Sequence, residues 1–134
     1  MTYEIVIPGP AKGKGRPRFG GGRTFTDKGT LIAEAWIKHC AIQQVGHLAL
    51  ECPVAVKMVI DVMPAASWSK KKRDAALSGA LQATGKPDVD NASKLALDAL
   101  NGIVWRDDAQ VCDLHVSRRY APIAQTTMTI TPLA

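Results

Sequence analysis

Hydrophobic and polar residues alternate in several short stretches of this chain, and a period of two predicts β-strands. Residues 3–7 form the first stretch, which Pro8 ends. Residues 54–62 are apolar on one face and partly apolar on the other, as in a strand that is buried on one side and half-covered on the second. The same reasoning predicts three further strands, at residues 103–105, 111–120 and 127–131.

Apolar residues recur every three to four positions elsewhere, and this spacing predicts amphipathic helices at residues 30–48 and 91–101. A further helix is predicted to run to about Ser78, with a serine at its N-cap and Gly79 at its end. The resulting order, β-loop-α-β-α-α-β-β, predicts a mixed α/β (α+β) fold with helices packed on a mixed sheet. We expect a single domain over residues 1–134.

Composition agrees with a globular protein and adds a hint about partners. The 134 residues are 46% hydrophobic and 22% charged, which is typical of chains that bury a core. A net charge of +5 favours a polyanionic partner, most simply nucleic acid. The apolar stretches end well before the ~18–20 residues of a membrane span, and the N-terminus lacks a signal-peptide pattern. We therefore expect a cytoplasmic protein with no membrane partner, associated with the nucleoid when it acts.

The cysteines argue against thiol or zinc chemistry. Cys40, Cys52 and Cys112 form no CxxC motif, and no histidine lies at zinc-site spacing beside them. Free thiols in a reducing compartment are the simpler interpretation.

A basic segment rich in glycine and proline separates the first strand from the first helix. Residues 8–25 hold three prolines and six glycines, which predicts a mobile loop. Its basic residues are Lys12, Lys14, Arg16, Arg18 and Arg23. The first four recur at every second position, so an extended chain would place them along one edge, where they suit a phosphate backbone. A solvated tether is the alternative interpretation.

A second basic cluster opens the helix that ends near Ser78. It consists of Lys70, Lys71, Lys72 and Arg73. Positive charge in a first turn opposes the helix dipole, and an external anion would compensate for it. A solvated helix face explains the cluster as well.

Acidic residues concentrate further along, with six of the twelve in residues 88–113. Asp88 and Asp90 are two apart in a segment predicted to be extended, so their carboxylates should project from one face. Asp90 also lies at the predicted N-cap of the following helix, and Lys94 follows one turn later. Taken singly, these residues indicate a helix cap and an exposed ion pair.

Asp107 and Asp108 form a second acidic pair about 20 residues later, which alone indicates a turn. This turn returns to the first pair if residues 103–105 run antiparallel to the preceding helix. Carboxylates gathered in this way would need a cation, and oxygen-only ligands suit Mg²⁺. Such a site can polarise a phosphodiester and generate hydroxide, with Lys94 balancing charge at the phosphate.

Several motifs together resemble the RusA family of Holliday junction resolvases. The central motif runs Lys86-Pro87-Asp88-Val89-Asp90-Asn91-x-x-Lys94 and continues through residues 97–103 to Asp107-Asp108-Ala109-Gln110-Val111. Further matches are Arg16-Pro17-Arg18, residues 67–72 and Arg119-Tyr120. The motifs lie in family order and spacing over nearly the whole chain, and they indicate a member of phage or prophage type.

The resemblance implies an endodeoxyribonuclease that resolves four-way DNA junctions by paired symmetric nicks, in recombination and repair. It implies Mg²⁺ as cofactor, with Mn²⁺ as a substitute, no small-molecule cofactor, and a homodimer whose two-fold axis suits the junction. The family's catalytic residues are three metal-binding aspartates and a lysine, here Asp88, Asp90, Asp108 and Lys94. Asp107 is an additional candidate ligand, and Lys86 joins the two basic segments as an expected DNA contact.

Two other functions stay open from the residues alone. The same site would serve a nuclease that cuts flaps, forks or plain duplex. A DNA-binding module without catalysis would use its acids only as helix caps and turns.

Overall fold

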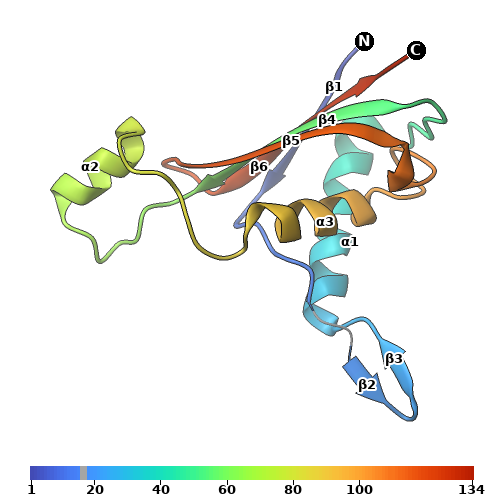
Figure 1. Cartoon of the computed structure of the whole chain (residues 1–134), viewed down its shortest axis with the longest axis horizontal. Helices are drawn as coiled ribbons and strands as arrows, with labels where there is room; N and C mark the ends of the chain where they lie inside the picture. The colour runs from blue at the N-terminus through green and yellow to red at the C-terminus, as the bar shows by residue number, and fades with distance from the viewer. Residues whose placement is uncertain (16–17) are drawn as a thin grey trace.

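The computed structural model describes residues 1–15 and 18–134, without the side chains of Arg18 and Phe25. Its main sheet (Figure 1) contains β1 (Tyr3–Pro8), β4 (Val54–Val62), β5 (Val111–Tyr120) and β6 (Gln125–Pro132). The strand order is β1-β6-β4-β5, in which β4 and β5 are parallel and the other neighbours are antiparallel. The mixed α+β architecture expected from the sequence is confirmed.

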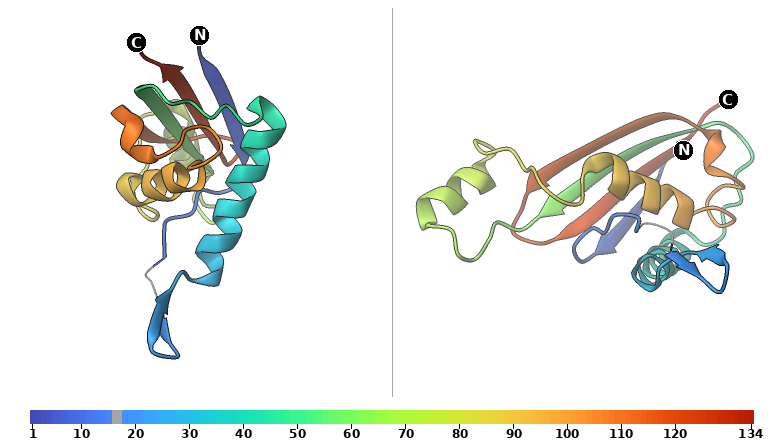
Figure 2. Two further views of the ribbon diagram at one scale, coloured as in Figure 1. Left: turned by 90° about the vertical axis from the view of Figure 1, so that its right-hand side faces the viewer. Right: turned by 60° about the horizontal axis from the view of Figure 1, so that its bottom comes forward.

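Two helices, α1 (Lys28–Val45) and α3 (Val89–Ala99), lie on the same face of this sheet (Figure 2). The third, α2 (Lys70–Ser78), extends beyond the end of β4 and away from the other two (Figure 1). Ser69 caps α2 by accepting a hydrogen bond from the Lys72 amide (3.2 Å), and Gly79 ends it at a φ of 88°. Among the described residues, no helix is long and apolar enough to cross a membrane.

The hydrophobic core lies between the sheet and the two helices. From β4, Val54, Val56, Met58 and Ile60 point into it, as the alternation along this strand predicts. From α3, Leu95 enters the core, with Ala92, Ala96 and Ala99 beside it. Burying the Leu95 side chain contributes about 2 kcal/mol, and the small alanines let the helix lie close to its neighbours. Because this face of α3 is buried in the core, the polar side chains of its other face point toward solvent.

Both amphipathic helices begin and end earlier than the sequence predicts. Asp27 caps α1 through the Thr30 amide (3.2 Å), and Gly46 ends it at a φ of 72°, so the helix covers 28–45 instead of 30–48. Asp88 occupies the N-cap of α3, which places Asp90 in the first turn. The expectation that Asp88 and Asp90 project together from an extended segment is therefore wrong, because the helix begins at Val89.

Residues 103–105 form a buried turn and not the short strand predicted. Ile103, Val104 and Trp105 are all buried, and Trp105 forms isolated bridges with Leu50 and Asn101. The Trp105 indole N–H donates to Asn101 Oδ1 (2.9 Å), which satisfies the one polar atom of its side chain. These three apolar residues cover the end of the core. In the sequence, a short apolar run of this kind has the same pattern as a short buried strand.

Part of the predicted loop at residues 8–25 is a two-stranded hairpin. Its strands, β2 (Arg18–Gly20) and β3 (Arg23–Phe25), are antiparallel. The turn between them has a φ of 58° at Gly21 and 76° at Gly22, the two positive values that a tight hairpin turn demands and glycine supplies. The Gly-Gly pair is the sequence signal for this turn.

Candidate active site

The turn that carries Asp108 is held rigidly. Residues Asp108–Gln110 form a short 3₁₀ helix, η1, capped by the Asp107 carboxylate, which accepts from the Ala109 amide (3.3 Å). The Gln110 side chain accepts from the amide of Asp107 (3.0 Å) and donates to the carbonyls of Leu50 (2.8 Å) and Cys52 (3.0 Å). The carboxylate of Asp107 is thus engaged in the cap, whereas that of Asp108 reaches α3.

Asp108 meets Asp98 of α3, and their carboxyl groups share a hydrogen bond. This bond raises the pKa of Asp108, and burial and the charges of Asp98 and Asp107 act in the same direction. Burial disfavours the charged form of Asp98, but hydrogen bonds from Lys14 and Asp108 outweigh it and lower the pKa of Asp98. Asp98 is therefore the more acidic of the two carboxyl groups, and Asp108 the less acidic.

Lys14 supplies the positive charge at this pair, with its ammonium group donating to Asp98 Oδ2. Its backbone amide donates to Asn91 Oδ1 (3.2 Å), so the chain before the hairpin runs along α3. A Cβ on Gly13 would lie 3.1 Å from Pro87 Cβ and closer still to the Asn91 amide, which explains the glycine there. Lys14 was predicted to face DNA, and here it forms an ion pair with α3.

One face of α3 presents charged residues one turn apart. Asp88 at the N-cap forms no side-chain cap hydrogen bond, and Asp90, in the first turn, is exposed. Lys94 follows Asp90 by four residues and is exposed, and Asp98 follows Lys94 by another four. Asp98 is not among the site residues predicted from the sequence, although the spacing of four that links it to Lys94 and Asp90 was the signal.

The predicted metal ligands are spread along α3. Asp88 lies at its N-cap and Asp90 in its first turn, whereas Asp108 packs against Asp98, about 12 Å further along the helix axis. Among the described residues, no group of three His, Cys, Asp or Glu side chains is close enough to hold a metal ion. The donor set nonetheless consists of carboxylate oxygens, the ligands that a hard divalent cation prefers.

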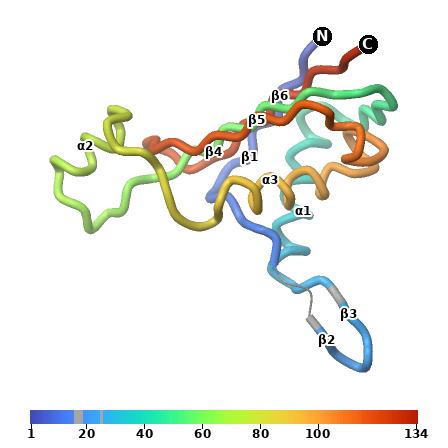
Figure 3. Tube along the Cα trace, viewed as in Figure 1, coloured from blue at the N-terminus to red at the C-terminus, as the bar shows by residue number. Residues whose placement is uncertain are grey.

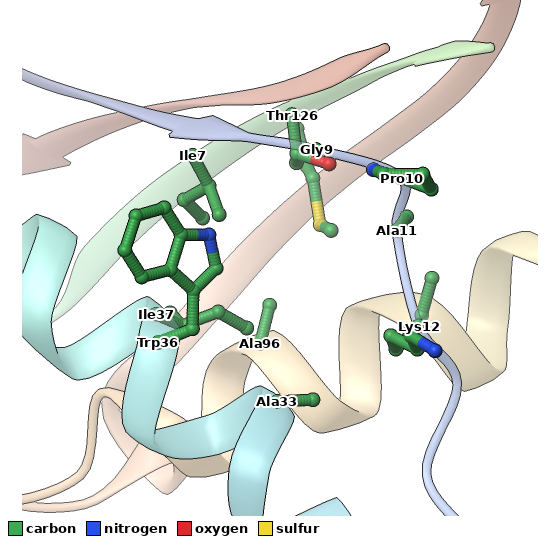
Figure 4. Close-up of a pocket in the computed structure, with 12 residues that line it drawn as sticks. Ile7, Gly9, Pro10, Ala11, Lys12, Ala33, Trp36, Ile37, Ala96 and Thr126 are labelled. Carbon is green, nitrogen blue, oxygen red and sulfur yellow. The ribbon is translucent and has the colours of Figure 1, made fainter. Parts of the chain in front are cut away.

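The basic residues predicted to bind DNA lie in two separate places. Arg23 is exposed in β3 of the hairpin, whereas Lys12 is exposed beside α1 and α3 (Figure 4). Arg16 and the side chain of Arg18 lie outside the described residues. The four basic residues of α2, Lys70, Lys71, Lys72 and Arg73, are also exposed, as is Lys86. The Lys72 ammonium lies 4.0 Å from the Trp68 ring centroid, and Trp68 packs edge-on against Tyr120. Figure 3 shows the hairpin and α2 at opposite ends of the molecule, with α3 between them.

A small apolar pocket lies between α1, α3 and the chain after β1 (Figure 4). Its walls include Ile7, Ile37 and Ala96, and the Trp36 indole N–H donates to the Pro8 carbonyl (2.9 Å) beside it. The pocket adjoins the packed face of α3, and the carboxylates occupy the other face. We interpret it as a gap in packing.

Comparison with known proteins agrees with these features. The chain matches the family described as Endodeoxyribonuclease RusA over residues 8–131. It is 47% identical over 66 residues to a Bacillus subtilis (strain 168) protein described as "Uncharacterized protein YqaN". This match covers 49% of the chain and 46% of that protein, so the chain spans about half the length of the curated relative it matches. The resemblance found in the sequence is confirmed: the chain belongs to the RusA family of endodeoxyribonucleases, enzymes that hydrolyse phosphodiester bonds within DNA.

Proposed function

We propose that this protein is a Mg²⁺-dependent endodeoxyribonuclease that resolves four-way DNA junctions by paired symmetric nicks, with Mn²⁺ as a substitute metal. The observation that carries this proposal is the start of α3, where Asp88 lies at the N-cap and Asp90 and Lys94 lie one turn apart on the charged face. Asp108 is brought to the same helix by a rigid turn. Recombination and repair in the cytoplasm, at the nucleoid, are the processes that such an activity serves.

Asp88, Asp90 and Asp108 would hold the metal, as the family motif implies. In the described residues they do not yet form one site, because Asp108 packs against Asp98, about 12 Å along α3 from Asp90. When bound, Mg²⁺ supplies a Lewis acid for the phosphate and lowers the pKa of a bound water. Lys94 is exposed one turn beyond Asp90, where its ammonium offsets charge that develops on the phosphate. Asp98 orients Asp108 through their shared hydrogen bond and is a positioning residue. Asp107 fixes the turn through its cap.

The basic residues at the two ends of the molecule would bind the DNA backbone on either side of α3. The hairpin side offers Lys12 and Arg23, together with Arg16 and Arg18 of the same segment. The other side offers the basic cluster of α2 and Lys86. Contacts so far apart suit a substrate with arms that diverge from one point better than they suit a short linear site.

A homodimer completes the proposal. A four-way junction has approximate two-fold symmetry, so a C₂ dimer presents equivalent sites to opposing strands and makes two matched nicks. Light scattering of the purified protein should therefore give twice the mass of the 134-residue chain.

The deciding experiment compares substrates. Purified protein is incubated with a labelled four-way junction, a flap and a linear duplex, each with Mg²⁺ or with a chelator. We expect paired nicks in the junction with Mg²⁺ alone, and little cutting of the duplex. Equal cutting of junction and duplex would overturn the resolvase function, and binding without any cutting would favour a non-catalytic module.

Variants test the site separately from the substrate. Asp88→Asn should abolish cleavage while junction binding is kept or tightened, because an anion facing the phosphates is removed. Glu4→Gln is the matched control, since Glu4 is an exposed acid on β1, outside α3 and the two basic segments. An Asp88→Asn variant that cuts at the normal rate would refute the ligand assignment.

A further inference from the structure

Phe19 is the most exposed aromatic ring in the described part of the chain. Its side chain is 84% accessible, and it lies in β2, two residues before Gly21, the first glycine of the hairpin turn. Isolated apolar residues are common on surfaces. This one, however, is held on a strand at the end of a projecting hairpin, where it makes no contribution to the core.

The backbone of Phe19 is held in the regular structure of the hairpin. Phe19 is paired with Thr24 across two antiparallel strands, and the Gly21–Gly22 turn closes them tightly. Figures 1 and 2 show the hairpin projecting from the N-terminal end of α1, beyond the body of the protein. The strands therefore fix the ring in place without covering it.

Both ends of the hairpin are attached to the start of α1. On the entry side, the Gly15 amide donates to Thr30 Oγ1 (2.8 Å), and Thr30 is buried. On the exit side, the Asp27 carboxylate accepts from the Thr30 amide (3.2 Å). Because Lys14 contacts Asn91 and Asp98, the attachment continues to the charged face of α3. Through these contacts, the segment that leads into the Phe19 hairpin is connected to the candidate active site.

The charged residues in the segment around Phe19 indicate which kind of partner its ring contacts. Residues 5–26 contain five basic residues and no acidic one. A second copy of this basic segment would meet like charges, and an exposed aromatic ring within a basic segment is a combination that binds nucleic acid by stacking and by phosphate contacts.

We propose that Phe19 stacks on an unpaired or end-exposed base at the branch point of the DNA and so helps to select branched substrates over duplex. This inference rests on the proposed function. In a continuous duplex, each base pair is covered on both faces, so insertion of a ring must first separate a stacked step. At a branch point the stack is already interrupted, and the same insertion costs less. Phe19 then acts as a specificity-determining residue and takes no part in the chemistry.

The test uses a four-way junction with 2-aminopurine at the branch point, and a duplex with 2-aminopurine at its centre, both with EDTA. The wild type should decrease the fluorescence of the junction probe, because 2-aminopurine is quenched when the ring stacks on it. Phe19→Ala should remove most of this decrease and weaken junction binding about tenfold, with duplex binding changed less than about twofold. Phe19→Trp should restore both effects because it also stacks.

Ile123→Ala is the control, since Ile123 is 67% exposed in the turn between β5 and β6, away from the basic hairpin. It should leave the fluorescence and both affinities unchanged. A Phe19→Ala variant that matches the wild type on the junction overturns the inference, while cleavage by the wild type still supports the proposed function. If Phe19→Ala instead changes the mass in light scattering, the ring contacts a second copy and the inference is also overturned. A wild type that neither binds nor cuts the junction overturns both.

Discussion

Asp98 and Asp108 share a hydrogen bond between their carboxyl groups, although one lies in α3 and the other in η1. Two acids held together in this way repel each other once both are ionised, and Lys14 offsets only part of that charge. The pair is therefore the place where a bound cation would most affect the stability of the fold.

Addition of Mg²⁺ should raise the melting temperature of the wild type. A ligand at ten times its dissociation constant stabilises the fold by about 1.4 kcal/mol, which corresponds to a rise of about 5 °C in a domain of this size. Asp108→Asn should abolish the rise and leave the metal-free protein as stable as the wild type or more stable. Differential scanning calorimetry with Mg²⁺ and with a chelator measures both. An undiminished rise in Asp108→Asn would exclude Asp108 as a ligand.

Lys14→Met should destabilise the metal-free protein at pH 7, because it removes the ion pair with Asp98. The loss should be only about 1 kcal/mol, because solvent screens the exposed part of this ion pair. The pKa of Asp98 is lowered in the folded protein, so the stabilisation is present above the unfolded pKa of about 3.9 and is lost as the pH falls through the folded pKa. Urea titrations at pH 7 and at about pH 2.5 should show the difference from wild type shrinking in acid. Lys12→Met, an exposed lysine of the same segment, should have little effect at either pH.

Gly13→Ala and Gly29→Ala should have opposite effects. A Cβ on Gly13 meets Asn91 and Pro87, so alanine there should cost about 1–2 kcal/mol and loosen the chain from α3. Gly29 lies in the first turn of α1 with only a contact of 3.6 Å to Asp27, so alanine there should stabilise by up to about 1 kcal/mol. Chemical denaturation measures both. Equal effects would contradict the close approach at Gly13.

Arg119→Met should destabilise more than Asp61→Asn does. The Asp61 carboxylate is buried and accepts a hydrogen bond from Arg119 Nε (2.7 Å), whereas the arginine side chain is mostly exposed. Loss of the arginine leaves a buried charge without its partner, at a cost of about 2 kcal/mol, whereas loss of the charge leaves an arginine that water solvates. Unfolding in guanidinium compares the two variants, and a larger loss in Asp61→Asn would contradict this order.

Replacement of Lys70, Lys71, Lys72 and Arg73 by serine should weaken junction binding and reduce its salt dependence. Each phosphate contact that is lost lowers the slope of log K against log salt by about 0.9. Lys57→Ser, an exposed lysine in β4, is the control and should leave the slope unchanged. An unchanged slope in the α2 variant would make this cluster a solvated helix face.

The elements that the sequence predicted well are those whose signals act locally. The strand around Met58 follows from alternation, and α2 from Ser69 and Gly79 at its two ends. Signals that depend on tertiary contacts were harder to interpret. Trp105 lies in a turn because the core needs a large side chain at its end, and Asp98 joins the candidate site because η1 brings Asp108 to it.

The predicted start of α3 shows the same limit of what local sequence signals can decide. Asp88 and Asp90 are both good capping residues, so composition does not decide which of them precedes α3. The choice of Asp88 shifts the helix by two residues and changes which carboxylates share a face. The match to the family motif does not depend on where α3 begins, because the motif specifies residue identities and their spacing and not the local conformation.

Helix α2 has only Ala76 buried and shares no part of the core around Met58 and Leu95. Substitutions along its surface therefore leave the free energy of folding almost unchanged, whereas those on the buried face of α3 affect folding. Evolution can alter the charge and length of α2 without endangering the rest of the molecule. Related enzymes are thus free to diverge in how they hold DNA while their cutting machinery stays the same.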